Sequence, residues 1–335
     1  PEPYDAIIIK GNTRHLRPTL YDLLAHRALE YFENDERDIS RPPYAFEIAG
    51  NEAFAPADLF VKARFSTNDS LSLQHKALLI YQDLVEFHLK DAKPDALIDA
   101  DLNRLDFVFE NSVAENKDSL YTAALEQLIE KYGGNAVAKG AKFRLAAWYE
   151  SKAATYDPLK DTTYRHFRSK ARTLAFEVAK DSSVKNEAWM NSIDLLKEIE
   201  RRSFSFKVEK VNLPSQPFRA LVSYRNLNLL HFRLLKADEA LKKSLQANDD
   251  NNNFWDILAR ASSIRNWQQN LPATNDFQEH HVEIKLDGLP GGEYYLVALS
   301  DASYDRKKTL VGARLLYVSN IAFVNQQDKY FVLNR

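Results

Sequence analysis

The chain of 335 residues is long enough for two domains with separate cores, and its 45% hydrophobic and 12% aromatic residues are typical of globular proteins. Its formal net charge of −2 gives no electrostatic attraction to nucleic acid or to an anionic membrane, and no apolar run approaches the ~20 residues that span a bilayer. The lack of cysteine excludes disulfides, cysteine-based zinc sites and thiol nucleophiles.

Apolar side chains recur at helical spacing through the first half of the chain, which predicts an all-helical domain over residues 1–202. Thr19 can cap the first helix, and Asp22 lies where an acidic side chain favours the first helical turn. Residues 35–68, with the pair Pro42-Pro43, are predicted to form a connector. Helices are predicted over about 20–34, 57–64, 69–90, 95–113, 118–132, 135–156, 161–180 and 184–201.

The unit from Ser119 to Tyr149 is the most informative part of this half. Gly133 ends one helix, Asn135 leads into the next, and small residues such as Ala138 lie where two helices would approach. This pattern is typical of a helical hairpin of the tetratricopeptide (TPR-like) type, although no strict repeat period fits the neighbouring units. The sequence therefore predicts either a helical repeat with a concave binding face or an irregular bundle.

From about residue 203 the apolar residues alternate, which predicts strands. Their spacing favours an antiparallel β-sandwich of immunoglobulin-like type over 203–335, with a helical insert at about 237–268. Trp255 and Trp267 are placed together on the second helix of that insert. The strands are predicted over 203–211, 219–224, 229–235, 281–286, 293–299, 309–318 and 321–333. The fold class is α+β and multidomain.

Few residues carry a signal for metal binding. The segment His280-His281-Val282-Glu283 places His281 and Glu283 on one face of a strand, where the two side chains could bind a metal together. The oxygen-rich loops Glu33–Asp38 and Asn248–Asn253 could hold Ca²⁺, but they lack the spaced pattern of a dedicated calcium loop. Solvated surface is the favoured interpretation of each, so we expect no metal site.

The signals for catalysis are no stronger. Asp99, Asp101 and Asp106 do not converge on one point of their helix, so they are interpreted as solvated helix surface. Three serines lack the strained glycine-flanked turn that exposes a nucleophile: Ser119, Ser151 and Ser223. We therefore expect no catalytic residue, no cofactor-binding residue, no cofactor and no enzyme activity.

Aromatic residues of the helical half have two interpretations. Tyr121, Trp148, Tyr149 and Trp189 occur at helical spacing, which favours packing between helices. The alternative places some of them on a concave face that binds a peptide or glycan.

Four segments resemble the N-terminal region of the large alpha-2-macroglobulin-like proteins of Bacteroidetes. Three of them lie in the strand half: Leu213–Asn226, Leu289–Val297 and Tyr317–Arg335. The fourth, Arg17–Ala28, is similar to the segment that begins the helical part of the same proteins. Because the chain starts at Pro1 and its last strand runs to Arg335, we expect the natural protein to be longer.

The resemblance implies an exported protein that faces the periplasm or is associated with the cell envelope, often as a lipoprotein. It also implies macroglobulin-type sandwich domains and a full-length protein that traps or inhibits proteases. A chain without cysteine cannot hold the thioester of that family, so no functional residue is carried over.

The expected function is a non-catalytic structural and interaction region. Its partners would be downstream domains of the same polypeptide and proteases or envelope proteins, with no nucleic acid and no direct membrane insertion. The alternative is a cell-envelope receptor whose helical repeat binds a peptide or glycan. A third and weaker option is a hydrolase whose site is assembled from distant segments.

Overall fold

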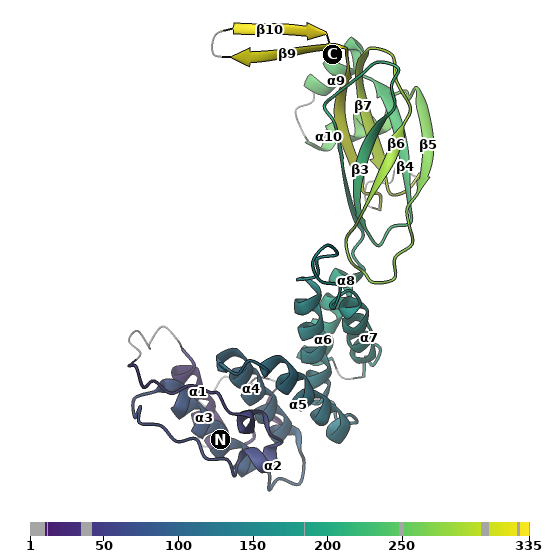
Figure 1. The fold of residues 1–335 in the computed structure, drawn as a ribbon. Helices are drawn as coiled ribbons and strands as arrows, with labels where there is room; N and C mark the ends of the chain where they lie inside the picture. The colour runs from purple at the N-terminus through teal and green to yellow at the C-terminus, as the bar shows by residue number, and fades with distance from the viewer. Residues whose placement is uncertain are drawn as a thin grey trace. The chain divides into compact units, whose positions relative to one another are not determined.

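The computed structural model describes residues 11, 13–34, 42–183, 185–247, 251–302, 308–326 and 329–334. Most helices precede the strands along the chain (Figure 1), which confirms the α+β class at this coarse level. The residues form two compact units. The helical unit comprises Pro1–Thr155 and Lys170–Leu196, and the strand unit comprises Tyr156–Ser169 and Lys197–Arg335.

The predicted helices are present, with shifts of a few residues at their ends. Their bounds are α1 Leu20–Phe32, α2 Ala57–Phe60, α3 Leu73–His88, α4 Asp95–Asn111, α5 Lys117–Tyr132, α6 Lys139–Ala153, α7 Phe167–Ala179 and α8 Glu187–Glu200, with a short 3-10 helix, η3, at Asn51–Phe54. The predicted start of α1 is confirmed. Thr19 Oγ1 accepts a hydrogen bond from Asp22 N, and Asp22 Oδ2 accepts one from Thr19 N at 2.7 Å, which closes a capping box. No described helix is long and apolar enough to cross a membrane.

Neighbouring helices of the helical unit pack in chain order, with α1 on α3, α3 on α4, α4 on α5 and α5 on α6. They share one core, in which Leu84, Leu105 and Leu125 are fully buried. Gly140 shows how closely the helices approach, because a Cβ atom there would lie only 3.0 Å from Leu102 Cδ1 on α4. A small residue therefore lies where α6 approaches α4.

The strand unit contains two packed sheets. The first is antiparallel in the order β1-β3-β6, and the second has the order β2-β8-β7-β4-β5. The bounds are β1 Ser203–Val208, β2 Val211–Asn212, β3 Phe218–Arg225, β4 Leu229–Lys236, β5 Arg265–Asn270, β6 His280–Leu286, β7 Gly292–Leu299 and β8 Val311–Val318. Side chains of both sheets, such as Val222 and Ile284 from one and Leu230 and Leu296 from the other, fill a common core. The unit is therefore a β-sandwich.

The insert contains two helices, α9 Glu239–Gln246 and α10 Asn251–Arg260. They cover the face of the five-stranded sheet that points away from the sandwich core, where Leu258 packs with Leu235 and Val297. The central strands of this sheet are thus covered on both faces, which explains why β4 and β7 have apolar residues at consecutive positions.

Two details of the strand half differ from the prediction. The second insert helix ends at Arg260, and Trp267 lies on β5, where its ring stacks on Phe232 of β4 at 5.3 Å. The pair Ser262-Ser263 interrupts the helical pattern, and cross-strand stacking favours an extended chain beyond it. The sandwich is also not wholly antiparallel, because Val211 of β2 pairs parallel with Tyr317 of β8.

The final predicted strand is a hairpin of two strands, β9 Ile321–Gln326 and β10 Lys329–Asn334. The predicted break reaches Gln327 and Asp328, which lie outside the described residues. The hairpin forms a two-stranded sheet of its own among the described strands. Val332 is 73% exposed and Ile321 is 60% exposed, so apolar side chains of the hairpin face solvent.

The turn between β3 and β4 binds the end of α8, within the strand unit. Asn226 has a φ of 56°, the left-handed conformation, and its Nδ2 donates to Ile199 O at 2.8 Å and to Arg201 O at 3.0 Å. The Arg225 guanidinium donates to Ile199 O and Glu198 O. These side chains satisfy carbonyl groups that a helix end leaves without partners.

Replacing Asn226 tests this role. We expect Asn226→Ala to lower the free energy of unfolding by about 2–3 kcal/mol. The substitution removes two hydrogen bonds, and it places alanine in the left-handed region without the hydrogen bonds that compensate asparagine there. Asn226→Gly loses the same hydrogen bonds but relieves the backbone cost, so we expect a smaller loss of about 1–2 kcal/mol. Urea unfolding followed by circular dichroism measures both. Equal losses in the two variants would contradict the backbone contribution.

Candidate functional site

The helical unit contains a polar cleft of about 370 Å³ between α1, α3 and α4. Its floor includes Leu29 and Phe107, and its walls carry carboxylates, amides, an imidazole and a phenol. The described lining residues are Arg17, His26, Leu29, Glu30, Glu33, Tyr81, Asn103, Asp106, Phe107, Glu110 and Asn111. We refer to this set as the polar cleft.

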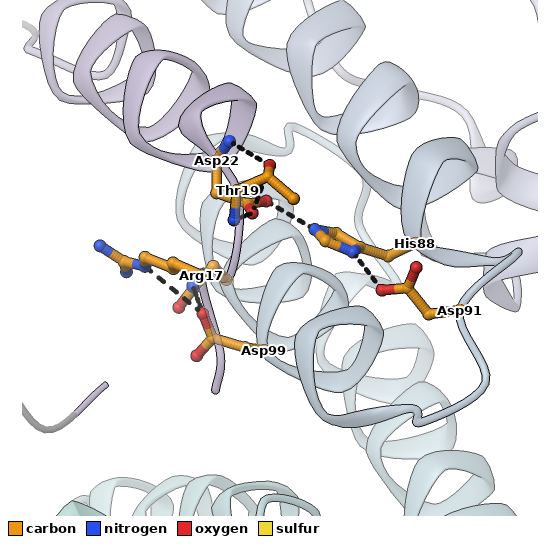
Figure 2. Close-up of polar contacts among 7 residues, drawn as sticks. Arg17, Thr19, Asp22, His88, Asp91 and Asp99 are labelled. Atoms are coloured by element: carbon orange, nitrogen blue, oxygen red, sulfur yellow. Dashed lines mark hydrogen bonds and ion pairs between the residues drawn. The ribbon is translucent and has the colours of Figure 1, made fainter. Parts of the chain in front are cut away.

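A buried ionic array stands next to the cleft, at the start of α1 (Figure 2). Asp22 is completely buried, and its Oδ1 lies 2.6 Å from His88 Nε2 at the end of α3. The other ring nitrogen, Nδ1, lies 2.7 Å from Asp91 Oδ2. Thr19 completes the shell of Asp22 by donating from its Oγ1 at 2.8 Å. Arg17, which lines the cleft, pairs with Asp99 of α4 at 3.7 Å.

The array favours the cationic form of its histidine. Burial alone would lower the pKa of His88, but the hydrogen bonds to Asp22 and Asp91 outweigh it and raise the pKa above 6.5. Burial would likewise raise the pKa of Asp22, and the hydrogen bonds from His88 and Thr19 outweigh it and lower the pKa below 3.8. With both ring nitrogens facing carboxylates, His88 donates two hydrogen bonds and links α3 to the first turn of α1.

The polar cleft lowers the pKa of its own histidine, His26, in contrast to the array. Burial, followed by the nearby Arg17 guanidinium, lowers the pKa of His26 to about 4, so this histidine is neutral at pH 7. Partial burial raises the pKa of Glu33, although the hydrogen bond from Tyr81 at 2.6 Å opposes the shift, and the charges of Glu110 and Glu30 add to it. The carboxylates outnumber the cations along this wall, so the cleft is anionic.

The cleft carries several groups that can bind a ligand. Asp106 is already held by Arg144 at 2.5 Å and by the Tyr121 hydroxyl at 2.7 Å. Apart from the Tyr81 phenol, none of the described lining residues carries a hydroxyl, thiol or amine that could act as a nucleophile. The amide oxygen of Asn103 and the carboxylate of Glu110 can accept hydrogen bonds from a ligand, whereas Asn111 Oδ1 already accepts one from Gln74 Nε2 at 2.8 Å.

The interpretation of Asp101 as solvated helix surface is wrong, and Asp99 and Asp106 are only partly solvated. Asp101 is only 3% exposed and pairs with Arg104, which lies one turn further along α4. Asp99 is half-buried against Arg17, and Asp106 is half-buried against Arg144. Each carboxylate is paired with a cation, and the pairing offsets the free-energy cost of burying its charge. They point to different neighbours, as the spacing predicted, and do not form one site.

The residues considered for metal binding are engaged elsewhere in the strand unit. His280 Nε2 lies 2.8 Å from Asp276 Oδ1, and Asp276 Oδ2 pairs with Arg165 at 3.0 Å. Glu283 pairs with Arg219 at 2.6 Å across the sheet. The described residues contain no group of three His, Asp or Glu side chains able to hold a metal ion. The remainder of the two oxygen-rich loops, residues 35–38 and 248–250, lies outside the described residues.

One pair of the kind used in nucleophilic catalysis was missed, because it forms across strands. Ser223 on β3 lies opposite His281 on β6, and Ser223 Oγ is 2.8 Å from His281 Nδ1. Glu279 lies 3.8 Å from the other ring nitrogen, too far for a hydrogen bond. His281 and Glu279 are exposed, and none of these residues lines a described cavity of the strand unit. Register between strands, rather than any motif, brings the pair together.

The aromatic residues of the helical half mostly pack. Tyr121 is buried and stacks on Phe109 at 4.3 Å. Trp148 and Tyr149 are half-buried against the helical core, and Trp148 Nε1 donates to Asp118 at 2.8 Å. Trp189 Nε1 donates to Ala179 O at 2.9 Å. These contacts are those of side chains between helices.

Comparison with known proteins yields little. No family model matches the chain, and no curated protein matches it. Among solved structures, it is similar to a CARDB domain from Pyrococcus furiosus that was solved in complex with di-metal ions. The two share 12% identity over 36% of this chain and 94% of that one, with a TM-score of 0.22. A likeness at this level supports no conclusion about function.

The array predicts unequal effects for the loss of its buried imidazole and the loss of its exposed carboxylate. Replacing His88 with Gln should lower the free energy of unfolding by about 3–5 kcal/mol at pH 6, because the buried Asp22 charge loses its cation. Asp91→Asn is the matched control, since Asp91 faces the same ring but is 36% exposed, and we expect about 0–1 kcal/mol. Urea unfolding measures both variants. An equal loss in the two would show that burial of Asp22 does not set the cost.

The same array predicts a pH window for stability. The raised pKa of His88 means that its contribution is complete below pH 6.5 and is lost as the pH rises through the folded-state value. The lowered pKa of Asp22 means that its contribution is complete above pH 3.8 and is lost as the pH falls through the folded-state value. The array should therefore stabilise the helical unit most between these two values. In an NMR titration we expect His88 to titrate above pH 6.5 and His26 near pH 4; the reverse order would contradict the assignment.

Proposed function

We propose that the chain is a non-catalytic structural and interaction region of an alpha-2-macroglobulin-like, protease-trapping protein of the cell envelope. The observation that carries the proposal is the place of the similar segments in the sandwich. Leu213–Asn226 contains β3, the central strand of the three-stranded sheet, and Leu289–Val297 contains most of β7, an inner strand of the other. Tyr317–Arg335 contains the end of β8 and the hairpin. Segments that form the centre of a sandwich are the ones a macroglobulin-type domain would need.

The use made of charged residues supports a scaffold role. Some of the buried ionisable groups described above pair across separate segments, as Asp22 and His88 join α1 to α3. Within the strand unit, Asp276 likewise joins the segment that carries Arg165 to the segment that precedes β6. A catalytic group must instead face a substrate in a cleft. The packing of successive helices in chain order supports a TPR-like platform. The export and envelope location rest on the sequence resemblance alone.

A protease-trapping test distinguishes this proposal from its alternatives. The natural full-length protein would be incubated with trypsin, and residual activity measured on a small chromogenic peptide and on a large protein substrate. A trap encloses the protease, so we expect cleavage of the protein substrate to fall at least tenfold while cleavage of the small peptide is retained. Equal activity on both substrates, with or without the protein, would overturn the trapping role.

The second candidate is a receptor whose helical unit binds a peptide or glycan, and the polar cleft favours it. Its anionic wall would select peptides that carry arginine or lysine, with an affinity that falls as salt increases. Titration calorimetry with a blocked tetra-arginine peptide and a neutral oligosaccharide tests this. Glu110→Gln, in the cleft, should weaken peptide binding, whereas Glu126→Gln, exposed on α5 and outside the cleft, should not. Equal effects of the two substitutions would place binding elsewhere.

A further inference from the structure

A second cavity of the helical unit, of about 270 Å³, lies between α4, α5 and the segment that joins η3 to α2. It is lined by different residues of α4 from those of the polar cleft. Its walls are apolar, with Phe54, Leu97, Leu105, Ala124 and Leu128 among them. We propose that this cavity binds the tyrosine side chain of a partner polypeptide, with the phenol hydroxyl donating a hydrogen bond to Asp101.

The wall of the cavity carries one buried ion pair with an unused acceptor. Asp101 is 3% exposed and Arg104 is fully buried, and both line the cavity. Asp101 Oδ1 accepts from Arg104 Nε at 2.9 Å and from Nη2, while Nη1 donates to Ala53 O. Oδ2 of Asp101 has no hydrogen bond or ion pair to any residue that the structure describes. This oxygen can therefore accept a hydrogen bond from a ligand that brings a donor into the cavity.

The pair also determines which donor fits. Arg104 already balances the charge of Asp101, so a cationic ligand would leave an uncompensated charge in an apolar cavity. A neutral hydroxyl satisfies Oδ2 without adding charge. A cavity of ~150 Å³ is enough to hold benzene, so about 270 Å³ leaves room for a substituted single ring. These requirements together describe a phenol.

The rim favours a polypeptide as the source of the phenol. Asp58, Gln127 and Lys131 line the cavity with exposed side chains, which can pair with main-chain amides and carbonyls beside an inserted residue. Tyrosine loses little conformational entropy when it is anchored in this way. The proposal goes beyond the function proposed above and holds whichever larger protein contains the chain.

The test measures binding to the intact chain by NMR, through the methyl signals of Leu97, Ala124 and Leu128. The probes are N-acetyl-tyrosinamide, N-acetyl-phenylalaninamide, p-cresol and toluene. We expect the tyrosine and cresol probes to bind at least tenfold more tightly than the analogues without a hydroxyl, because only they donate to Asp101. Ala124→Leu, which fills the cavity, should weaken binding at least tenfold. Ala123→Leu is the matched control, since Ala123 is exposed on the same helix and lies outside the cavity.

The remaining outcomes each decide a part of the proposal. Equal affinity for tyrosine and phenylalanine probes would overturn the role of Asp101. Binding of p-cresol without binding of N-acetyl-tyrosinamide would overturn the polypeptide source and point to a free phenol. Retention of binding in Ala124→Leu would overturn the location. If that variant fails to fold by circular dichroism, Leu128→Phe, which also narrows the cavity, takes its place. None of these results depends on the protease-trapping test.

Discussion

A charge buried away from water must be neutralised where it lies, and both units are arranged around charges of this kind. Asp22 has no solvent exposure, and His88 neutralises it from a helix that is 66 residues distant in sequence. In the strand unit, Asp276 is met by His280 and by Arg165, which is 111 residues away. An unpaired buried charge costs several kcal/mol, so these contacts restrict which segments can lie together. Much of the packing between the segments depends on that restriction.

The same arrangement limits where function can reside. Ionisable groups that hold helices or loops together are not free to contact a ligand. A ligand can instead bind at surfaces where polar atoms can still form hydrogen bonds. Two such places among the described residues of the helical unit involve α4, which contributes Asn103 and Glu110 to the polar cleft and Asp101 to the apolar cavity. One helix therefore supports two chemically different concavities. The interactions proposed for this unit rest on these two concavities.

Local signals in the sequence predicted the elements well, and long-range contacts explain what was missed. The capping box at Thr19 and the helical periods depend only on neighbours in the chain, so they could be recognised. Strand β5 could not, because Arg265–Asn270 is polar and becomes a strand by pairing with β4. Nothing in the spacing of Asp22 and His88 indicates their contact. The burial of Asp101 could have been predicted more easily, because Arg104 lies three residues later on the same helix and provides a local clue.

The hairpin of β9 and β10 bears on how the isolated chain behaves at high concentration. Its outer backbone edges have no third strand among the described residues, and Phe331, Val332 and Leu333 expose much of their apolar surface. Open edges with apolar side chains are templates for pairing with other chains, and folded proteins usually protect them with charge or a covering segment. Lys329 provides one such charge at the start of β10. Pairing between the hairpins of different molecules would then make the chain self-associate. A third strand across either edge would suppress that pairing.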